Sequence, residues 1–496
     1  MFLFSRGILL FLLFLIYKSF SQDSVFWHIS DFHLNNKYFD MKDCYENHPF
    51  ANYLCDSSVL LVKSALEFLK NETSKEKPVF ISLTGDDGPH LDDLTREFTF
   101  QTITNLIKYY NEAIDPTIPF IPVVGNHDVF PANKMSPDPK DEFSSIAWCK
   151  DLENIWQKFI IDDGQPQSDF KKGCYFSRYL KDRKLLITSI NGLIWYANNP
   201  LAKPKEGQSI EDYDPLGQFA WLESLYMWAR ENHVKVVNTN HFPLTVAAAD
   251  PEKFKNMYDL PNKKFVDLIR RYKDIILVNL VAHEHVDSFR LVLDPKNQIA
   301  ESMFLLAPSV SPFHFHDFGA FNPRLRKFVF NSITNKIINY HQYILNISSP
   351  ESINQGWKYD YNFLERYNKT ILSPETLLEI VNDFEKYEDY QHTWSQYWNS
   401  ELGYTHREGS CANVPSKDSF CRCKHICAFK YADFEDLNLC LDKCDAQNII
   451  ISGRIIFAII LSVIVVVAVI LLAIINKRRR NDNLENDSMP IVHEEI

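Results

Sequence analysis

The sequence contains little glycine, with 14 glycines among 496 residues, whereas aromatic residues make up 14% of it. This composition excludes a low-complexity chain and is typical of a densely packed globular protein. The formal net charge is −12 and residues 22–350 contain no basic patch, so electrostatic binding of nucleic acid is not expected. Internal repeats are also absent, and the length allows a main domain of about 300 residues plus a smaller unit.

Long apolar runs occur only near the two ends of the chain. The first, Gly7 to Tyr17, follows a single positive charge and precedes small residues at Ser19 and Ser21. It is too short to span a bilayer, and its layout predicts a secretory signal peptide over residues 1–21.

The second apolar run, Ile455 to Ile475, has Ser462 as its only polar side chain. It is long enough to cross the hydrocarbon core of a membrane. Four basic residues, Lys477 to Arg480, follow at once, which places that side in the cytoplasm and argues against a lipid-anchor signal. We therefore expect a single-pass type I protein with a transmembrane helix over 455–475, a cytoplasmic tail over 476–496, and the remainder extracellular or lumenal.

Short segments that carry histidine, aspartate or asparagine follow apolar, strand-like runs. The runs are Val25 to Ile29, Val79 to Leu83, Ile118 to Val124, Val234 to Val237 and Ile275 to Val281. The segments are Asp31-Phe32-His33, Gly85-Asp86, Gly125-Asn126-His127-Asp128, Asn240-His241 and His283-Glu284-His285. A lone Asp-x-His is most often an ordinary surface feature. The ordered set is different, because loops at the carboxyl ends of sheet strands gather ligands in α/β folds, and it predicts a site for two metal ions.

These segments resemble those of the calcineurin-like metallophosphoesterases and, more narrowly, of the acid sphingomyelinase-like phosphodiesterases. The narrower resemblance rests on four further motifs: Thr84 to His90, Ser189-Ile190-Asn191-Gly192, Asp214 to Leu222, and Ala307 to Pro312 followed by Asn322-Pro323 and Arg326. It implies an α/β fold, a four-layer αββα sandwich, over residues 22–350. It also implies a metal-dependent phosphoric diester hydrolase.

The resemblance assigns ligands for two divalent metal ions. One ion would be held by Asp31, His33 and His285, the other by Asn126, His241 and His283, with Asp86 bridging both. This mixture of ligands suits zinc, manganese or iron(II), and the family and an oxidising compartment favour zinc. The expected reaction is attack on the phosphodiester by a metal-bridged hydroxide.

Protonation of the leaving group requires further residues. His127 follows the ligand Asn126 directly, and we expect Asp128 to orient it. His90 is a second candidate, carried over from the family's Gly-Asp loop. The chain departs from the family pattern where Ala282 replaces the glycine of Gly-His-x-His, and where the loop after His241 lacks glycine.

All ten cysteines lie between the predicted signal peptide and the predicted span, as expected in an oxidising compartment. Cys44 and Cys55 resemble a disulfide pair of the family, and Cys149 and Cys174 are a second candidate pair. The other six are Cys411, Cys421, Cys423, Cys427, Cys440 and Cys444. Their spacing fits no standard zinc site, so we expect disulfides, with the pairing open.

Residues 351–450 are predicted to form a helical, cysteine-rich region, with one helix starting at Ser373 as N-cap and Pro374 in its first turn. N-glycosylation is expected at Asn71, Asn346 and Asn368, each in an Asn-x-Ser/Thr triplet.

The substrate stays open at this stage. Acid sphingomyelinases carry a lipid-presenting saposin-type module ahead of the catalytic domain, and here about ten residues separate the signal peptide from Asp31, so we expect no such module. Soluble phosphodiesters of nucleotide type are the first hypothesis. Sphingomyelin and polyphosphate are alternatives with the same site, and a non-catalytic surface protein on this fold is a further one.

Overall fold

The computed structural model describes residues 23–46, 48–296, 298–314, 319–331, 333–386, 393–405 and 419–486. The predicted signal peptide, Cys411 and the end of the predicted cytoplasmic tail lie outside these residues. The chain divides into two compact units, Met1–Asn438 and Leu439–Ile496.

The first sheet has six strands in the order β12-β11-β10-β1-β2-β3. Its strands are β1 (Asp23–Ile29), β2 (Ile81–Leu83), β3 (Phe120–Pro122), β10 (Arg324–Asn331), β11 (Lys336–Ile344) and β12 (Lys358–Asn362). Strands β1, β2 and β3 pair in parallel, whereas β10 to β12 add antiparallel neighbours beyond β1. The carboxyl ends of β1, β2 and β3 therefore share one edge of this sheet.

The second sheet also has six strands, in the order β4-β5-β6-β7-β9-β8. They are β4 (Phe176–Leu180), β5 (Leu185–Ile190), β6 (Lys235–Asn240), β7 (Ile276–Val281), β8 (Ser288–Leu293) and β9 (Ala300–Leu306). Strands β5, β6, β7 and β9 are parallel. Strands β5 to β9 are buried almost throughout, as expected of a sheet covered on both faces.

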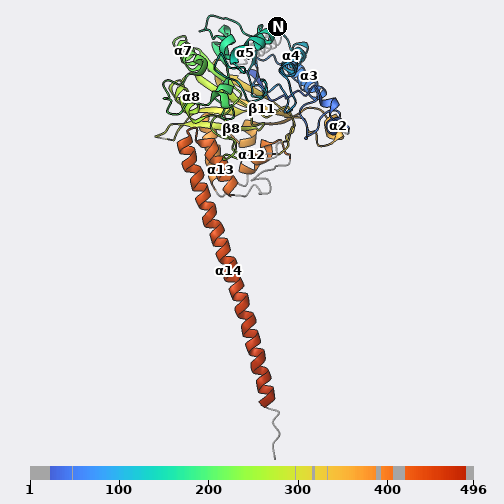
Figure 1. Cartoon of the computed structure of the whole chain (residues 1–496), viewed down its shortest axis with the longest axis vertical. Helices are drawn as coiled ribbons and strands as arrows, with labels where there is room; N and C mark the ends of the chain where they lie inside the picture. Colours follow the sequence, from blue (N-terminus) through green and yellow to red (C-terminus); the bar gives the residue numbers. More distant parts are fainter. Residues whose placement is uncertain are drawn as a thin grey trace, which may run out of the picture. The chain divides into compact units, whose positions relative to one another are not determined.

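Helices cover the two sheets. The longer ones in this unit are α3 (Val59–Lys75), α4 (Arg96–Ala113), α5 (Ser145–Trp156), α7 (Gln218–Glu231) and α8 (Asp259–Arg271). Figure 1 shows α3 and α4 on one side of the sheets and α7 and α8 on the other. Ring contacts join Phe68 of α3 to Trp27 of β1, and Phe265 of α8 to Phe304 of β9. The predicted layered sandwich with two sheets is confirmed.

The C-terminal region contains mainly helices. Its elements are α9 (Pro350–Asn354), α10 (Phe363–Tyr367), α11 (Pro374–Glu385), α12 (Thr393–Glu401), α13 (Ser419–Lys430) and α14 (Phe434–Asn486), and short helices elsewhere are α2 (Lys42–Tyr45) and α6 (Phe170–Gly173). The start of α11 is confirmed, because the Ser373 side chain accepts a hydrogen bond from the Thr376 N–H and Pro374 occupies the first turn. Strand β12 was not predicted. It pairs with β11, because this edge of the first sheet still offers unpaired backbone groups.

Helix α14 contains the second apolar run. Within the described residues, one stretch is long and apolar enough to span a membrane, the 21 residues Ile459–Arg479. Its large side chains are exposed, which an aqueous environment would disfavour. The predicted span, 455–475, overlaps this stretch, and its orientation stays a prediction.

Candidate metal centre

The predicted ligands come from loops at the carboxyl ends of five strands. Asp31 and His33 follow β1, Asp86 follows β2, Asn126 follows β3, His241 follows β6, and His283 and His285 follow β7. The Asp31 N–H donates to the Gly85 carbonyl and the Ala282 N–H to the His241 carbonyl. Neighbouring loops are therefore tied together by their backbones within each sheet.

Several of these residues have an unusual backbone conformation. The φ angles are 51° at Asp31, 41° at His33, 57° at Asp86, 71° at His283 and 60° at His285. Non-glycine residues seldom adopt this left-handed conformation, and each instance costs about 1–3 kcal/mol. The concentration of this conformation at one site indicates that the fold tolerates a local loss of stability, because the conformation directs these side chains toward a common point.

One group of donors surrounds His33 and His285. Their Nε2 atoms lie 3.1 Å apart, and His285 Nε2 lies 3.4 Å from Asp31 Oδ1. The same Nε2 of His33 is 3.6 Å from Asp86 Oδ2. Two ring nitrogens at this separation repel unless a proton or a cation lies between them, so the geometry fits a bound metal ion.

A second group surrounds His241. Its Nε2 lies 3.2 Å from Asp86 Oδ2, 3.1 Å from Asn126 Oδ1 and 3.2 Å from His283 Nδ1. Asp86 Oδ2 thus takes part in both groups, as a bridging carboxylate would. The donor set of imidazole nitrogen, amide oxygen and carboxylate suits divalent transition metals.

Hydrogen bonds on the outer side fix the histidine rings. The Nδ1–H of His33 donates to the Gly88 carbonyl at 2.7 Å, and that of His241 donates to the Thr84 carbonyl at 2.6 Å. Because a carbonyl can only accept, Nδ1 carries the hydrogen, so that in the neutral ring Nε2 is the nitrogen able to bind a metal, the usual arrangement around a ligating histidine. Burial also lowers the pKa of His33 and His285 well below the usual value, so both rings stay neutral, as metal binding requires.

The Asp128 carboxylate has a different role from the one predicted. It accepts hydrogen bonds from the backbone N–H groups of Asp86 (3.0 Å), Asp87 (2.7 Å) and Gly125 (2.7 Å). Among the described contacts of Asp128, none involves the His127 ring. Asp128 therefore holds the loops after β2 and β3 together instead of orienting the imidazole. Gly125 is required there, because a Cβ at this position would collide with the Asp86 carboxylate.

His90 and His127 both lie beside the ligands. The His90 ring centroid is 3.9 Å from that of His33 and 4.3 Å from that of His127, and the Phe313 ring stacks on His90 with a centroid distance of 4.7 Å. Burial lowers the pKa of His127 to about 4. For His90 burial also lowers the pKa, but the charge and hydrogen bond of Asp56, together with the charges of Asp86 and Asp31, outweigh it and the pKa is raised.

Asp56 is a residue that the sequence analysis missed. Its Oδ1 lies 2.8 Å from His90 Nδ1, and its Oδ2 accepts the His90 backbone N–H at 2.6 Å. The carboxylate is buried and therefore needs such partners. Its position directly after Cys55 is the only sequence signal, and that signal is weak.

The segment after β7 alternates between two roles. His283 and His285 belong to the two donor groups, whereas Glu284 accepts from Arg290 Nη2 at 2.7 Å and from Asn256 Nδ2 at 2.9 Å. Two residues after His285, the Asp287 carboxylate forms an ion pair with Arg326. All these side chains are buried except His283, which is partly exposed. Buried ion pairs therefore hold the chain on both sides of His285.

Ala282, which stands where the family has glycine, does not have a left-handed conformation. Its N–H donates to the His241 carbonyl at 2.8 Å, so the methyl group is accommodated and no glycine is needed.

The predicted disulfides Cys44–Cys55 and Cys149–Cys174 are confirmed. The first precedes Asp56 and so fixes the segment that supports His90. The C-terminal cysteines within the described residues, Cys421, Cys423, Cys427, Cys440 and Cys444, are also disulfide-bonded, as predicted.

Comparisons with known proteins define the class. Residues 24–287 match the family model described as calcineurin-like phosphoesterase, and residues 298–447 match the acid sphingomyelin phosphodiesterase C-terminal region. The chain belongs to the calcineurin-like phosphoesterases, in the branch that carries this C-terminal region. The predicted fold class and enzyme class, a metal-dependent phosphodiesterase, are thereby confirmed, and the fold implies a centre for two divalent metal ions.

Individual relatives agree with this assignment. The chain is 30% identical over 388 residues to the sphingomyelinase phosphodiesterase C of Dictyostelium discoideum, covering 72% of this chain and 81% of that protein. It is 27% identical over 425 residues to the human cyclic GMP-AMP phosphodiesterase SMPDL3A, covering 82% and 88%. The human acid sphingomyelinase-like phosphodiesterase 3b is 26% identical over 447 residues, covering 85% and 90%.

Proposed function

We propose that this protein is a membrane-anchored zinc phosphodiesterase that hydrolyses nucleotide-type or other phosphodiester substrates outside the cell or in a lumenal compartment. The observation that carries the proposal is the convergence of seven donor side chains from five loops, with Asp86 Oδ2 shared between two groups.

The proposed ligand assignment follows the two groups. Asp31, His33 and His285 would hold one ion, and Asn126, His241 and His283 the other, with Asp86 between them. When bound, two such ions supply Lewis acidity toward a phosphoryl group and a nucleophile generated from water. Zinc is proposed because imidazole nitrogens dominate the donor set and because the disulfides indicate an oxidising compartment.

The protein's own residues supply the proton for the leaving oxygen. His90 is the proposed donor, because Asp56 fixes its Nδ1 and leaves Nε2 on the opposite side of the ring. His127 lies beside it and is proposed to contact the phosphate. Asp56 acts through His90 and is a positioning residue. Asp128 positions the loop that carries Asn126.

Two substrate classes are supported by relatives. The human relative is named for cyclic GMP-AMP, which supports a nucleotide-type phosphodiester. The Dictyostelium relative is named as a sphingomyelinase phosphodiesterase, which supports sphingomyelin as a second candidate. Both substrates present a phosphodiester to the same centre, so the difference between them lies in the groups beyond the phosphate.

The proposed topology is type I. The apolar stretch Ile459–Arg479 and the basic residues at its end support a single span with the tail on the cytoplasmic side. Cleavage of a signal peptide near Ser21 would place the disulfides and the metal centre on the opposite side. Domain limits at 22–350 and 351–450 are part of this proposal.

Hydrolysis of bis(p-nitrophenyl) phosphate by the purified full-length protein in detergent tests the activity. We expect turnover to be lost on chelation and in His127→Ala. Turnover that survives both would contradict the two-metal assignment. Cyclic GMP-AMP, ATP, polyphosphate and sphingomyelin compared at pH 5 and 7 would then separate the substrate classes.

A further inference from the structure

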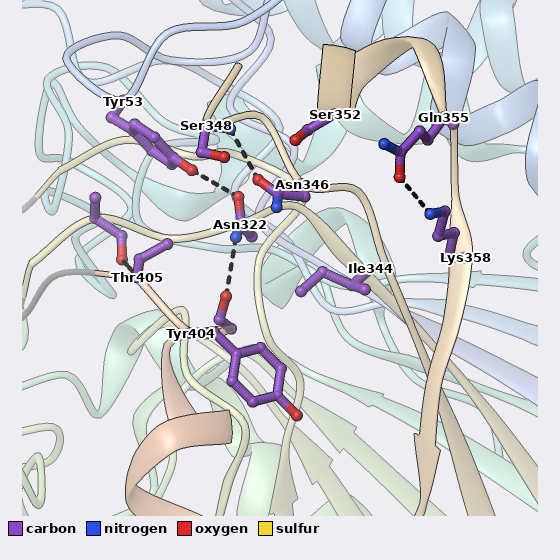
Figure 2. Close-up of a pocket in the computed structure, with 13 residues that line it drawn as sticks. Tyr53, Asn322, Ile344, Asn346, Ser348, Ser352, Gln355, Lys358, Tyr404 and Thr405 are labelled. Carbon is purple, nitrogen blue, oxygen red and sulfur yellow. Dashed lines mark hydrogen bonds between the residues drawn. The ribbon is translucent and has the colours of Figure 1, made fainter. Parts of the chain in front are cut away.

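A pocket separate from the predicted metal ligands lies between the catalytic part and the C-terminal region. It has a volume of about 600 Å³, which lies within the range of small-molecule sites. None of the predicted metal ligands lines it, and neither does His90 or His127. Figure 2 shows side chains from four segments around it, among them Tyr53, Asn322, Asn346, Lys358 and Tyr404.

Hydrogen bonds hold the walls of this pocket in place. The Tyr53 hydroxyl donates to Asn322 Oδ1 at 2.7 Å, and Asn322 Nδ2 donates to the Gly403 carbonyl at 2.9 Å (Figure 2). Thr405 donates from its hydroxyl to the Ala320 carbonyl. A pocket that combines hydroxyl and amide groups with tyrosine rings offers both hydrogen bonds and apolar ring faces, which is the pair of contacts that sugar rings use.

Asn346 connects the pocket to a possible modification. It is the first residue of Asn346-Ile347-Ser348, it is exposed, and it lines the pocket. Its Oδ1 accepts the Ser348 N–H at 2.9 Å, a local turn typical of asparagine. Within the described part of the chain, Nδ2 makes no hydrogen bond. The atom that a glycan would join is therefore free at the edge of a polar pocket.

The other two predicted acceptors differ from Asn346. Asn71 lies within helix α3, and Asn368 is the C-cap of α10 with φ 50°. Both are exposed, and neither lines the pocket. A glycan on either residue would start on open surface.

We propose that Asn346 is N-glycosylated and that the first sugars of its glycan occupy this pocket. In the transfer, a bond forms between Nδ2 and C1 of N-acetylglucosamine of a lipid-linked pyrophosphate donor. The C1–O bond to the pyrophosphate breaks, its electron pair leaves with the pyrophosphate, and the amide loses one proton. The inference rests on the lumenal placement proposed above. Sugars bound in the pocket would connect Asn346, which follows β11, to Tyr404 of the C-terminal region.

The test uses the full-length chain produced in a eukaryotic secretory host. A peptide-N-glycosidase is applied to the native protein and to denatured protein, and release is followed site by site by peptide mass spectrometry. We expect native release at Asn346 to be at least about tenfold slower than at Asn71 and Asn368, because release would require local opening of the pocket. After denaturation the three rates should be alike.

A matched pair of variants tests the role of the pocket. Tyr404→Ala removes a side chain that is 50% exposed and lines the pocket, whereas Tyr359→Ala removes one that is 49% exposed and does not. We expect only Tyr404→Ala to raise release at Asn346 to the rate at the other sites. If Tyr404→Ala does not fold, the comparison of sites in the unaltered chain remains decisive.

Different outcomes overturn different statements. An unmodified Asn346 beside modified Asn71 and Asn368, or equal native release at all three, overturns this inference and leaves the lumenal placement intact. If all three are unmodified, the proposed topology fails as well. Phosphodiesterase activity of Asn346→Gln should be unchanged.

Discussion

The Nδ1 atom of His90 lies 2.8 Å from Oδ1 of Asp56, and the second oxygen of the same carboxylate accepts the His90 backbone N–H. One buried carboxylate thus fixes both the ring and the main chain of a histidine that lies against the proposed metal ligand His33. This arrangement leaves His90 Nε2 on the opposite side of the ring. It gives a physical basis for a proton donor that the sequence suggested only through a family resemblance.

The first prediction concerns this pair. His90→Ala should lower kcat by about 10²–10⁴-fold for a substrate whose leaving group needs a proton. The loss should be much smaller with bis(p-nitrophenyl) phosphate, since p-nitrophenolate leaves unprotonated. Asp56→Asn should show the same dependence on the leaving group, with a smaller loss of kcat than His90→Ala. His48→Ala, at an exposed position, is the control, and equal losses with both substrates would contradict the role.

The second prediction concerns the metal ions. The purified protein should contain two divalent ions per chain by elemental analysis, and Asp86→Asn should reduce this content because its Oδ2 lies in both donor groups. The accompanying loss of activity should exceed the roughly 10–100-fold typical of outer partners of a metal site. Asp92→Asn, at an exposed position, should retain both ions. Full metal content in Asp86→Asn would show that this carboxylate is not a shared ligand.

The third prediction concerns the buried pair Glu284 and Arg290. Arg290→Met leaves the Glu284 charge buried and without its main partner, which should lower the free energy of unfolding by about 3–5 kcal/mol. Replacing Glu284 by Gln in the same chain should recover most of this loss. Denaturant unfolding of the two variants measures it.

The same pair should affect the metal centre, because Glu284 lies between His283 and His285. Glu284→Gln alone should weaken metal affinity by roughly 10–100-fold, as outer partners do, in a titration with zinc. An unchanged affinity would restrict Glu284 to a structural role.

The fourth prediction concerns Asp128. Asp128→Asn replaces one carboxylate oxygen by a donor that faces backbone N–H groups. Each N–H left without an acceptor should cost about 1–3 kcal/mol, measured by urea unfolding. Asp138→Asn, where the carboxylate accepts from the exposed Lys140 N–H, should have little effect. If His127→Ala reproduced the stability loss of Asp128→Asn, the separation of their roles would be wrong.

Local patterns in the sequence predicted much of the fold. The five strand-like runs correspond to β1, β2, β3, β6 and β7, because buried parallel strands require short continuous apolar stretches. The start of α11 was predictable from Ser373 and Pro374, since capping depends on residues a few positions apart. Strand β12 was missed, because its residues alternate only weakly and pairing with β11 decides its conformation.

The sequence by itself determined which side chains could bind metal and in what order they follow the strands, since ligand chemistry and strand patterns are local properties. The tertiary structure decided their partners. Three of these contacts join residues that are separated in sequence. The separation is 34 residues for Asp56 and His90, 6 for Glu284 and Arg290, and 42 for Asp86 and Asp128. Even the shortest of these depends on how β7 and β8 are arranged in the sheet, because burial and sheet pairing, rather than sequence spacing, bring such groups within hydrogen-bonding distance.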